Sequence, residues 1–290
     1  MKVYLNGEIV DEADARLPLR DRGVLFGDGL FETVRAYGGR PFRLDRHLAR
    51  LEKGCEALRL RLSLDGEEVE RAIGSLYRLN VVEGDAYVRI TVTGGFFDGN
   101  RNLERRLPPN LFILVEPYHG YPEESYRRGL RLVLAGARRN STSPLSRLKS
   151  NNYLEALIAK QEARDRGADE ALFLNERGEV AEAASANIFW AKGGTLFTPA
   201  EECGILAGIT REAVLELCGA EGIRCEQGAY PPSELYQADE AFLTVSTGEV
   251  VPVREIEGRS LFGPCPGPHT TLLASAYRRL VGEETGRAAG

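Results

Sequence analysis

The spacing of apolar residues predicts a mixture of strands and helices in the first 117 residues. Asn6 and Gly7, a favoured tight-turn pair, stand between two short apolar runs and predict a hairpin. Beyond it, a period of two predicts strands, and spacings of three and four predict helices. The predicted elements are strands at 30–37, 86–93 and 110–117, a helix at 45–59 with Asp45 as its cap, and a helix at 66–79.

The segment PYHGYP, at residues 117–122, combines two prolines with a glycine and predicts a break between two domains. We expect a smaller N-terminal domain over residues 1–118, an interdomain linker over 119–125 and a C-terminal domain over 126–290. In the second domain the pattern predicts strands at 130–134, 171–174, 180–183, 187–190, 241–245 and 250–255, and helices at 151–166, 210–221 and 270–281. Strands and helices do not alternate regularly, which favours an α+β fold over a doubly wound sheet.

Composition narrows the functional classes. A chain of 290 residues with 43% hydrophobic residues is long enough for two domains with a sizeable core. The net charge is −6 and the arginines are spread along the chain, so we expect no nucleic-acid partner. No signal peptide is expected at the N-terminus, and the longest aliphatic runs are too short to span a membrane, so we expect a cytoplasmic protein. The five cysteines show no metal-type spacing, and no metal site is expected.

Lysine is rare in this chain, and one lysine stands in a distinctive place. Only five of the 37 basic residues are lysines, and Lys149 lies in the segment RLKSNNY, ahead of a predicted helix. A guanidinium is not deprotonated in proteins, whereas a lysine amine can form the imine of a Schiff-base enzyme. A compositional bias towards arginine would also leave a few scattered lysines. Lys149 alone therefore does not decide between catalysis and chance.

Several longer stretches, taken together, resemble the class IV pyridoxal phosphate aminotransferases. The matching segments occur in family order between about Val3 and Val253, and they are YLNGEIV, DRGVLFGDGLFETVRAYGG, FRLDRHLARL, KSNNYLEALIAKQEARDRG, ADEALFLNERGEVAEAASANIFWAKGGTLFTP and GILAGITREAV. The family includes branched-chain aminotransferases, D-amino-acid aminotransferases and aminodeoxychorismate lyases. The resemblance implies a two-domain fold of type IV that holds pyridoxal 5′-phosphate between a smaller N-terminal α/β domain and a larger C-terminal domain.

The same resemblance implies roles for individual residues. Lys149 would be the catalytic residue, which holds the cofactor as a Schiff base and moves a proton. An ordinary lysine pKa of about 10.4 makes a poor base at neutral pH, so burial and cationic neighbours must lower it. The other cofactor contacts implied by the family motifs are Arg50, Tyr153, Glu182, Leu206, Ile209, Thr210, Ser246 and Thr247.

Physical chemistry supports several of these assignments independently. Gly208, Ile209 and Thr210 open a predicted helix, whose free N–H groups and dipole favour a phosphate, although such a sequence is also an ordinary helix cap. Arg50 can bind a phosphate through two hydrogen bonds, but a solvated helix arginine would look the same. Glu182 lies in the apolar run VAEAASANIF, where an unpaired carboxylate is costly to bury. A role opposite the cofactor's ring nitrogen would explain it.

The substrate is harder to predict. Strand periodicity places Phe31 and Arg35 on one face of a strand that lines the family's substrate pocket, and Arg101 lies in a later loop. D-amino-acid aminotransferases have a tyrosine at the position of Phe31, and typical branched-chain enzymes have EGAGEN where this chain has EAASAN. We expect a ping-pong aminotransferase for amino acids of branched-chain type and 2-oxo acids. Aminodeoxychorismate lyase is the alternative, D-amino-acid aminotransferase is a weaker one, and a non-catalytic pyridoxal phosphate protein is disfavoured by the complete Lys, Glu and Arg set.

The loop over residues 94–106 suggests self-association. It contains Phe96 and Phe97 close to three arginines, a common composition at interfaces, although a surface loop is the alternative. The family builds its active sites near a two-fold interface, so we expect a homodimer. In that dimer we expect Arg101 to reach the neighbouring subunit's pocket and help bind the substrate carboxylate.

Overall fold

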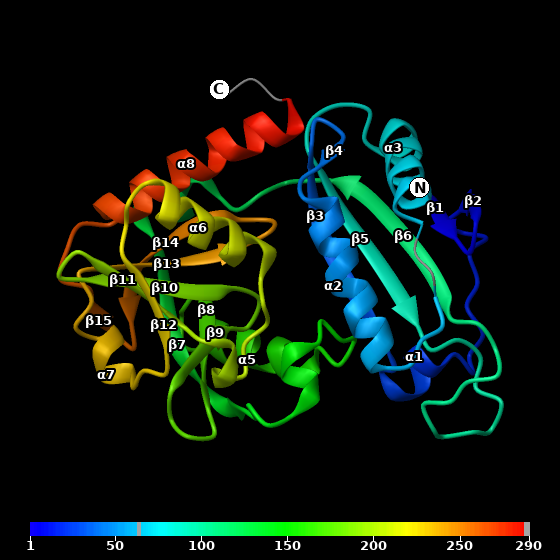
Figure 1. Ribbon diagram of the computed structural model, residues 1–290, viewed down its shortest axis with the longest axis horizontal. Helices are drawn as coiled ribbons and strands as arrows, with labels where there is room; N and C mark the ends of the chain where they lie inside the picture. Colours follow the sequence, from blue (N-terminus) through cyan, green and yellow to red (C-terminus); the bar gives the residue numbers. More distant parts are fainter. Residues whose placement is uncertain (63–64, 287–290) are drawn as a thin grey trace.

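The computed structural model describes residues 1–62 and 65–286, which form two halves lying side by side (Figure 1). Each half is built on its own sheet, with six strands in the first and nine in the second. Helices pack beside runs of neighbouring strands rather than alternating with them, which confirms the α+β prediction. Within the described residues, no helix combines the length and the apolar character that crossing a membrane requires.

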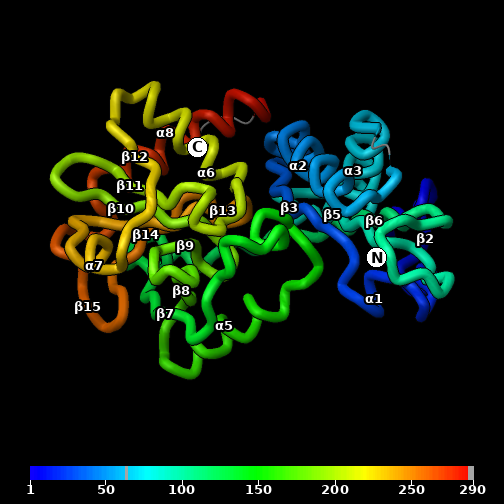
Figure 2. The backbone as a smooth tube through the Cα atoms, turned by 60° about the horizontal axis from the view of Figure 1, so that its bottom comes forward, coloured from blue at the N-terminus to red at the C-terminus, as the bar shows by residue number. Residues whose placement is uncertain are grey.

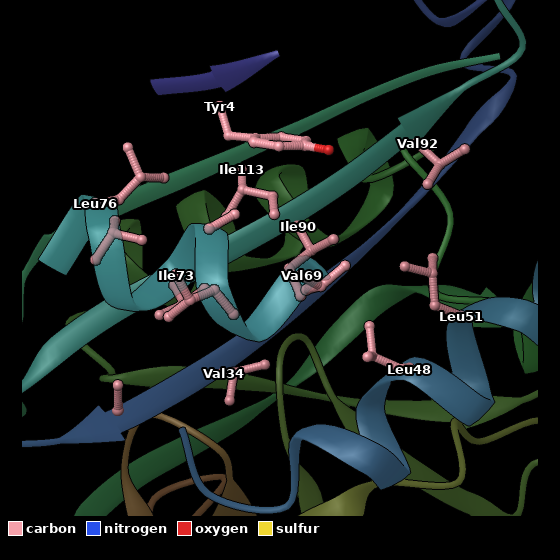
Figure 3. Close-up of a cluster of buried hydrophobic side chains, with 14 of the residues drawn as sticks. Tyr4, Val34, Leu48, Leu51, Val69, Ile73, Leu76, Ile90, Val92 and Ile113 are labelled. Atoms are coloured by element: carbon pink, nitrogen blue, oxygen red, sulfur yellow. The ribbon is translucent and has the colours of Figure 1, made fainter. Parts of the chain in front are cut away.

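The first sheet has the strand order β2-β1-β6-β5-β3-β4. Its elements are β1 (Lys2–Leu5), β2 (Glu8–Asp11), α1 (Arg22–Phe26), β3 (Gly29–Tyr37), β4 (Arg40–Pro41), α2 (Leu44–Ala57), α3 (Gly66–Asn80), β5 (Ala86–Thr93) and β6 (Asn110–Pro117). Figure 3 shows Val34, Ile90 and Ile113 of the sheet facing apolar side chains of α2 and α3. Because side chains alternate along a strand, this packing leaves Phe31 on the opposite face of β3.

The second sheet has the order β12-β11-β10-β13-β14-β7-β8-β9, with β15 paired to β14. Its strands are β7 (Leu130–Arg139), β8 (Glu170–Asn175), β9 (Val180–Ala183), β10 (Asn187–Lys192), β11 (Thr195–Pro199), β12 (Cys225–Gly228), β13 (Glu240–Val245), β14 (Glu249–Ile256) and β15 (Arg259–Ser260). Its helices are α4 (Glu123–Arg128), α5 (Leu154–Asp165), α6 (Ile209–Ala220), α7 (Pro232–Leu235) and α8 (Pro268–Thr285), with short 3-10 turns η1 (Pro144–Arg147) and η2 (Glu201–Cys203).

The last two strands in the order of the second sheet are covered on both faces. β8 and β9 are buried along their whole length, as expected for strands enclosed by other elements. Leu172 and Ile188 belong to the core on one side, whereas Phe173 packs in a different core with alanines of α5. The first sheet ends at Pro117 and β7 begins at Leu130. The predicted domain limits fall inside this interval, and they stay a prediction.

Four local predictions differ from the structure. Helix α2 begins after Arg43, which has a left-handed φ of 51°, so Asp45 lies in the first turn and is not the cap. Helix α5 begins at Leu154, three residues later than predicted, because residues 149–151 pair with β3 instead. Strand β7 continues to Arg139 beyond its apolar part, since its second portion pairs with β8. Strands β11 and β12 were not predicted as separate elements.

The two halves are joined through specific contacts. The segment before α5, green in Figure 2, reaches towards β3, and the amide of Asn151 donates to the carbonyl of Gly29 at 2.9 Å. At the far end of α8, Arg40 Nη1 donates to the carbonyl of Thr285 at 2.9 Å. Arg43 forms ion pairs with Glu216 of α6 and Glu284 of α8. These contacts join β3, β4 and the start of α2 to the segment before α5 and to helices α6 and α8 of the second half.

Candidate active site

The backbone around Lys149 is fixed to β3. The amide of Phe31 donates to the carbonyl of Lys149 at 2.9 Å, and Leu30 and Ser150 form a β-bridge. These contacts hold Lys149 in an extended segment between η1 and α5. Its Nζ atom lies 4.8 Å from the centre of the Phe31 ring. Lys149 therefore belongs to the second half of the molecule, while β3 of the first half fixes its backbone. Its side chain lies where the two halves meet.

The environment of Lys149 favours its neutral amine. Burial lowers its pKa to about 8, and the positive charges of Arg50 and Arg89 act in the same direction. Glu32 and Glu182 oppose the shift but do not cancel it. About a tenth of the amine is consequently unprotonated at pH 7, far more than for an ordinary lysine with a pKa of about 10.4, and an imine-forming or proton-transferring lysine needs this neutral form. The lowered pKa expected from the sequence is therefore present in the structure.

One cavity brings together nine of the residues predicted from the sequence. They are Phe31, Arg50, Lys149, Tyr153, Glu182, Leu206, Ile209, Thr210 and Ser246. These residues come from β3, α2, the segment before α5, β9, the start of α6 and the end of β13. The cavity thus lies where the two halves meet.

Arg50 is held in place by a buried acidic partner. Its Nε and Nη2 atoms donate to the two carboxylate oxygens of Glu32 at 2.8 and 2.7 Å, and its Nη1 donates to the carbonyl of Ala207 at 2.6 Å. His47 Nδ1 lies 2.7 Å from Glu32 Oε2. Burial opposes ionisation of Glu32, yet Arg50 and His47 hold its pKa at about 2. Glu32 is therefore a charged anchor for Arg50 beside the start of α6.

Glu182 is buried and has a partner at each carboxylate oxygen. Oε2 accepts a hydrogen bond from the amide of Leu206 at 3.0 Å and one from Asn187 Nδ2 at 3.3 Å. Oε1 lies 3.3 Å from Arg139 Nη2. Burial raises the pKa of Glu182, although Arg139 and the amide of Leu206 act against the rise. These contacts fix the carboxylate at one wall of the cavity.

The start of α6 forms another wall. Gly208 is the N-cap, and no side chain caps the helix there, so its first N–H groups remain available to an anion. The hydroxyl of Thr210 lies on the cavity and is hydrogen-bonded with the buried Tyr277 of α8. A Cβ atom on Gly208 would lie 2.1 Å from Asn187 Oδ1, which explains why glycine occupies the cap. Asn187 Nδ2 also donates to the carbonyl of Leu206 at 2.9 Å.

The loop after β13 is held by two tyrosines from the connecting segment. Ser246 lines the cavity, whereas Thr247 does not. The carbonyl of Thr247 accepts a hydrogen bond from the Tyr118 hydroxyl. The Tyr126 hydroxyl donates to the carbonyl of Gly248 at 3.1 Å. The connection between the halves thus also supports a cavity loop.

Tyr153 reaches the cavity by a different route from the one predicted. Lys149 and Tyr153 do not share a helix face, because Tyr153 is the residue that precedes the first turn of α5. Its ring meets Phe31 edge-on at a centroid distance of 5.6 Å, and its hydroxyl donates to the carbonyl of Ala184 at 3.3 Å. Both aromatic rings nevertheless line the cavity with Lys149.

Arg35 does not lie at the cavity, which corrects the expectation that it binds the substrate. Its Nη2 lies 2.8 Å from Asp85 Oδ2, and its Nη1 lies 2.8 Å from Glu249 Oε1. The rings of Tyr37 and Tyr118 lie 4.4 and 4.3 Å from its guanidinium carbon. These contacts occupy the guanidinium, so Arg35 joins the first sheet to β14.

Arg101 lines a neighbouring cavity that shares Leu145, Ser150 and Asn152 with the Lys149 cavity. Its side chain is exposed. The surrounding loop is better anchored than the sequence suggested, because Phe97 packs edge-on against Phe26 at 5.1 Å. Arg101 therefore stands at the mouth of the site.

Four residues around the site escaped the sequence analysis: Glu32, Arg89, Arg139 and Asn187. Glu32 had a visible signal, since it interrupts the apolar face formed by Leu30, Val34 and Ala36 on β3. Arg139 follows the apolar part of β7 and was left outside the predicted strand. The guanidinium carbon of Arg89 lies 3.9 Å from the centre of the Phe31 ring, with no acidic partner among the described residues. Nothing in the local sequence indicates that position.

The donor set of the cavity fits pyridoxal 5′-phosphate. Lys149 supplies an amine, Glu182 a carboxylate, and Arg50 with the uncapped start of α6 a phosphate site. Leu206 and Ile209 provide apolar surface for a ring. In the part of the chain that the structure describes, no cluster of His, Cys, Asp or Glu is arranged to hold a metal ion.

Comparison with known proteins agrees with this geometry. The model of the family described as amino-transferase class IV matches residues 29–256. The aminodeoxychorismate lyase of Bacillus subtilis (strain 168) is 34% identical over 291 residues, which cover 99% of this chain and 98% of that protein. The branched-chain-amino-acid aminotransferase of Pseudomonas aeruginosa is 33% identical over 293 residues, which cover 98% and 94%.

A solved structure shows the same likeness in three dimensions. The branched-chain aminotransferase of Thermoproteus uzoniensis, crystallised with norvaline, superposes with a TM-score of 0.90 at 34% identity, covering 98% of this chain and 95% of that one. The fold and the sequence matches agree over nearly the whole length. The chain therefore belongs to the class IV aminotransferases, enzymes of fold type IV that use pyridoxal 5′-phosphate.

Proposed function

We propose that this aminotransferase moves an amino group between an amino acid of branched-chain type and a 2-oxo acid, with Lys149 as the catalytic residue. The observation that carries the proposal is the lowered pKa of Lys149, about 8, inside the cavity that also holds Arg50, Glu182 and Thr210. A lysine, a carboxylate and a phosphate site on the walls of one cavity are what this cofactor chemistry needs.

Each side chain has one task in this proposal. The bound cofactor supplies an electron sink for the pair released at the substrate α-carbon. Lys149 Nζ would move a proton between the substrate α-carbon and the C4′ carbon of the bound cofactor, which its lowered pKa favours. Glu182, fixed by Leu206 and Arg139, would keep a proton at the ring nitrogen. Arg50 and the N–H groups at the start of α6 would hold the phosphate.

The walls near Lys149 support a substrate with an apolar side chain. Phe31, Leu148, Tyr153 and Ala184 line this part of the cavity, and burial of a branched side chain against such surfaces is favourable by about 0.8 kcal/mol per CH₂ group. In a ping-pong reaction the donor and the acceptor use the same site in turn.

Aminodeoxychorismate lyase is the second candidate, because a lyase of that name is similar over nearly the whole chain. The two reactions share the proton abstraction and differ in the bond broken afterwards. The deciding experiment is a panel that tests L- and D-amino acids with 2-oxo acids and, separately, the release of 4-aminobenzoate from aminodeoxychorismate. Turnover of branched-chain L-amino acids with no 4-aminobenzoate release supports the proposal, and the reverse pattern assigns the lyase.

The role of Lys149 has its own test. Borohydride reduction of the holoenzyme followed by peptide mass mapping should find the pyridoxyl group on Lys149. Lys149→Ala should abolish turnover while the circular dichroism spectrum stays unchanged. A label on Lys53, Lys160 or Lys192 would overturn the assignment.

We further propose a homodimer in which Arg101 serves the partner's cavity. Supporting features are the exposed apolar side chains of α1, including Val24 and Phe26, and of the loop between β5 and β6, including Leu103. Sedimentation should show a dimer, and a fully active monomer would refute the shared site. Mixing Lys149→Ala and Arg101→Ala subunits decides the geometry. If Arg101 acts across the interface, a mixed dimer keeps one complete site and regains activity, whereas action within one chain gives no recovery.

A further inference from the structure

Arg101 is presented by a loop whose backbone is clamped on both sides of it. Arg22 Nη1 donates to the carbonyl of Asn100 at 2.6 Å, and Arg22 Nη2 donates to the carbonyl of Asn102 at 3.2 Å. One guanidinium therefore fixes the residue before Arg101 and the residue after it. The Arg101 side chain itself forms no ion pair with any residue in the described ranges and lies on the cavity beside the Lys149 site.

Arg22 is fixed in turn by a buried carboxylate shared with a third residue. Arg22 Nε lies 2.6 Å from Asp28 Oδ2, and Arg105 Nη2 lies 2.5 and 2.7 Å from the two Asp28 oxygens. The three side chains are only 6%, 9% and 6% exposed. Arg105 Nη1 also donates to the carbonyls of Leu58, at 2.5 Å, and Leu103. Both ends of the loop are thus tied to the first half of the molecule.

Such a framework is costly to build for stability alone. Burying two guanidinium groups and one carboxylate carries a desolvation penalty that ion pairing only partly repays, and apolar residues of similar size often stabilise a protein as well. The distinct result of this framework is geometric. It holds the exposed guanidinium of Arg101 in one position, from which it can serve the partner's cavity in the proposed homodimer.

We infer that Arg22, Asp28 and Arg105 are positioning residues that hold Arg101 as the receptor for a carboxylate of the substrate. This inference rests on the proposed function, because it takes Arg101 as a substrate contact. The framework contributes to substrate binding before the chemical step, so its loss should raise KM and leave kcat nearly unchanged. The hydrogen bonds and ion pairs of its three side chains do not involve Lys149, Arg50 or Glu182, so cofactor affinity should change little.

Two neighbouring arginines provide a matched comparison. Arg105→Gln and Arg106→Gln each remove one positive charge from the same loop, but Arg106 is exposed and forms no ion pair in the described part of the chain. Arg105→Gln should raise KM for the amino acid about tenfold or more, since small displacements of a binding group are costly, with kcat within about twofold. Arg106→Gln should leave both constants within about twofold. Equal effects of the two variants would overturn the inference.

A double-mutant cycle separates this inference from the proposal on which it rests. If Arg105 acts through Arg101, Arg105→Gln should add nothing to the KM of Arg101→Ala. Additive effects would show that the framework does not act through Arg101. If Arg101→Ala alone leaves KM unchanged, the proposed substrate contact fails.

If Arg105→Gln does not fold, Arg22→Lys can test the inference instead. This variant retains the positive charge beside Asp28, so it should fold. Lysine cannot span the carbonyls of Asn100 and Asn102 as a planar guanidinium does. It should therefore raise KM in the same manner, and an unchanged KM would count against the inference.

Discussion

Glu32 and Arg50 meet in a two-point ion pair, with Arg50 Nε 2.8 Å from Glu32 Oε1 and Arg50 Nη2 2.7 Å from Glu32 Oε2. Glu32 lies on the helix-covered face of β3, while Arg50 projects from α2 to the cavity and contacts the carbonyl of Ala207. The pair therefore fixes the orientation of the guanidinium before any ligand binds. A preorganised group loses less freedom on binding than a mobile one.

Arg50→Ala should weaken cofactor binding more than it slows the chemical step. Phosphate contacts are made equally in the ground and transition states, and a charged hydrogen-bonded contact contributes about 1.5–3 kcal/mol. Titration of the apoenzyme with pyridoxal phosphate gives the affinity, and excess cofactor should restore most of kcat. Arg50→Ala combined with Glu32→Gln avoids an unpaired buried carboxylate and should show the same loss. Failure of excess cofactor to restore activity would assign Arg50 a different task.

The pH dependence of cofactor capture should report the pKa of Lys149. At a pH below its pKa of about 8 the Lys149 amine is charged and unreactive, and at a higher pH it is neutral. The rate at which the apoenzyme captures the cofactor should therefore rise with pH, with a midpoint near pH 8. Glu32 raises this pKa and Arg89 lowers it. Glu32→Gln should therefore move the midpoint to lower pH, and Arg89→Gln should move it to higher pH. Stopped-flow absorbance measures the rates, and shifts of the same sign in both variants would contradict the electrostatic account.

Glu182→Gln should retain the cofactor but slow turnover by about two to four orders of magnitude, equivalent to about 3–5 kcal/mol in the activation barrier. The amide oxygen can still accept the hydrogen bond from Leu206, so the wall keeps its shape, but a neutral group cannot stabilise the protonated ring nitrogen. Glu155→Gln is the control, because it removes the other carboxylate beside Arg139 at 3.1 Å. Steady-state kinetics at saturating cofactor should leave the control within about twofold, and an unimpaired Glu182→Gln enzyme would exclude the assigned contact.

Arg35→Ala should destabilise the protein without changing KM. Its guanidinium pairs with Asp85 and Glu249, and removing one partner of a buried pair costs about 3–5 kcal/mol in the free energy of unfolding. Arg71→Ala, which breaks an exposed pair with Glu67, should cost about 0–1 kcal/mol. Denaturant unfolding compares the two variants. A large rise in KM with unchanged stability would return Arg35 to the substrate site.

Cavity residues could be predicted from short motifs where the local structure of the motif follows from consecutive residues. The start of α6 is an example, since a few consecutive residues define a helix end. The extended segment of Lys149, by contrast, is held by its pairing with β3. Arg35 shows the limit of periodicity. A period of two correctly places Phe31 and Arg35 on one face, but four residues separate them by about 13 Å along a strand, and only the packing of the halves shows where the cavity ends.

Contacts between distant segments account for the other omissions. Glu32 and Arg50 are brought together by the packing of α2 on β3, and Arg139 meets Glu182 because β7 continues alongside β8. The framework of Arg22, Asp28 and Arg105 also depends on tertiary packing. The charges of these residues can be read from the sequence, but no local pattern identifies the partner of each one.

The close approach of Gly208 to Asn187 has a consequence for how this enzyme can change. Any side chain at position 208 would have to displace Asn187, which also holds the Leu206 carbonyl and one oxygen of Glu182. A displacement of the backbone at Gly208, where the phosphate is proposed to bind, would therefore also move the Glu182 carboxylate. Phosphate binding at the start of α6 and the position of the Glu182 carboxylate are thus coupled through Asn187. A substitution of Gly208 cannot change one without changing the other.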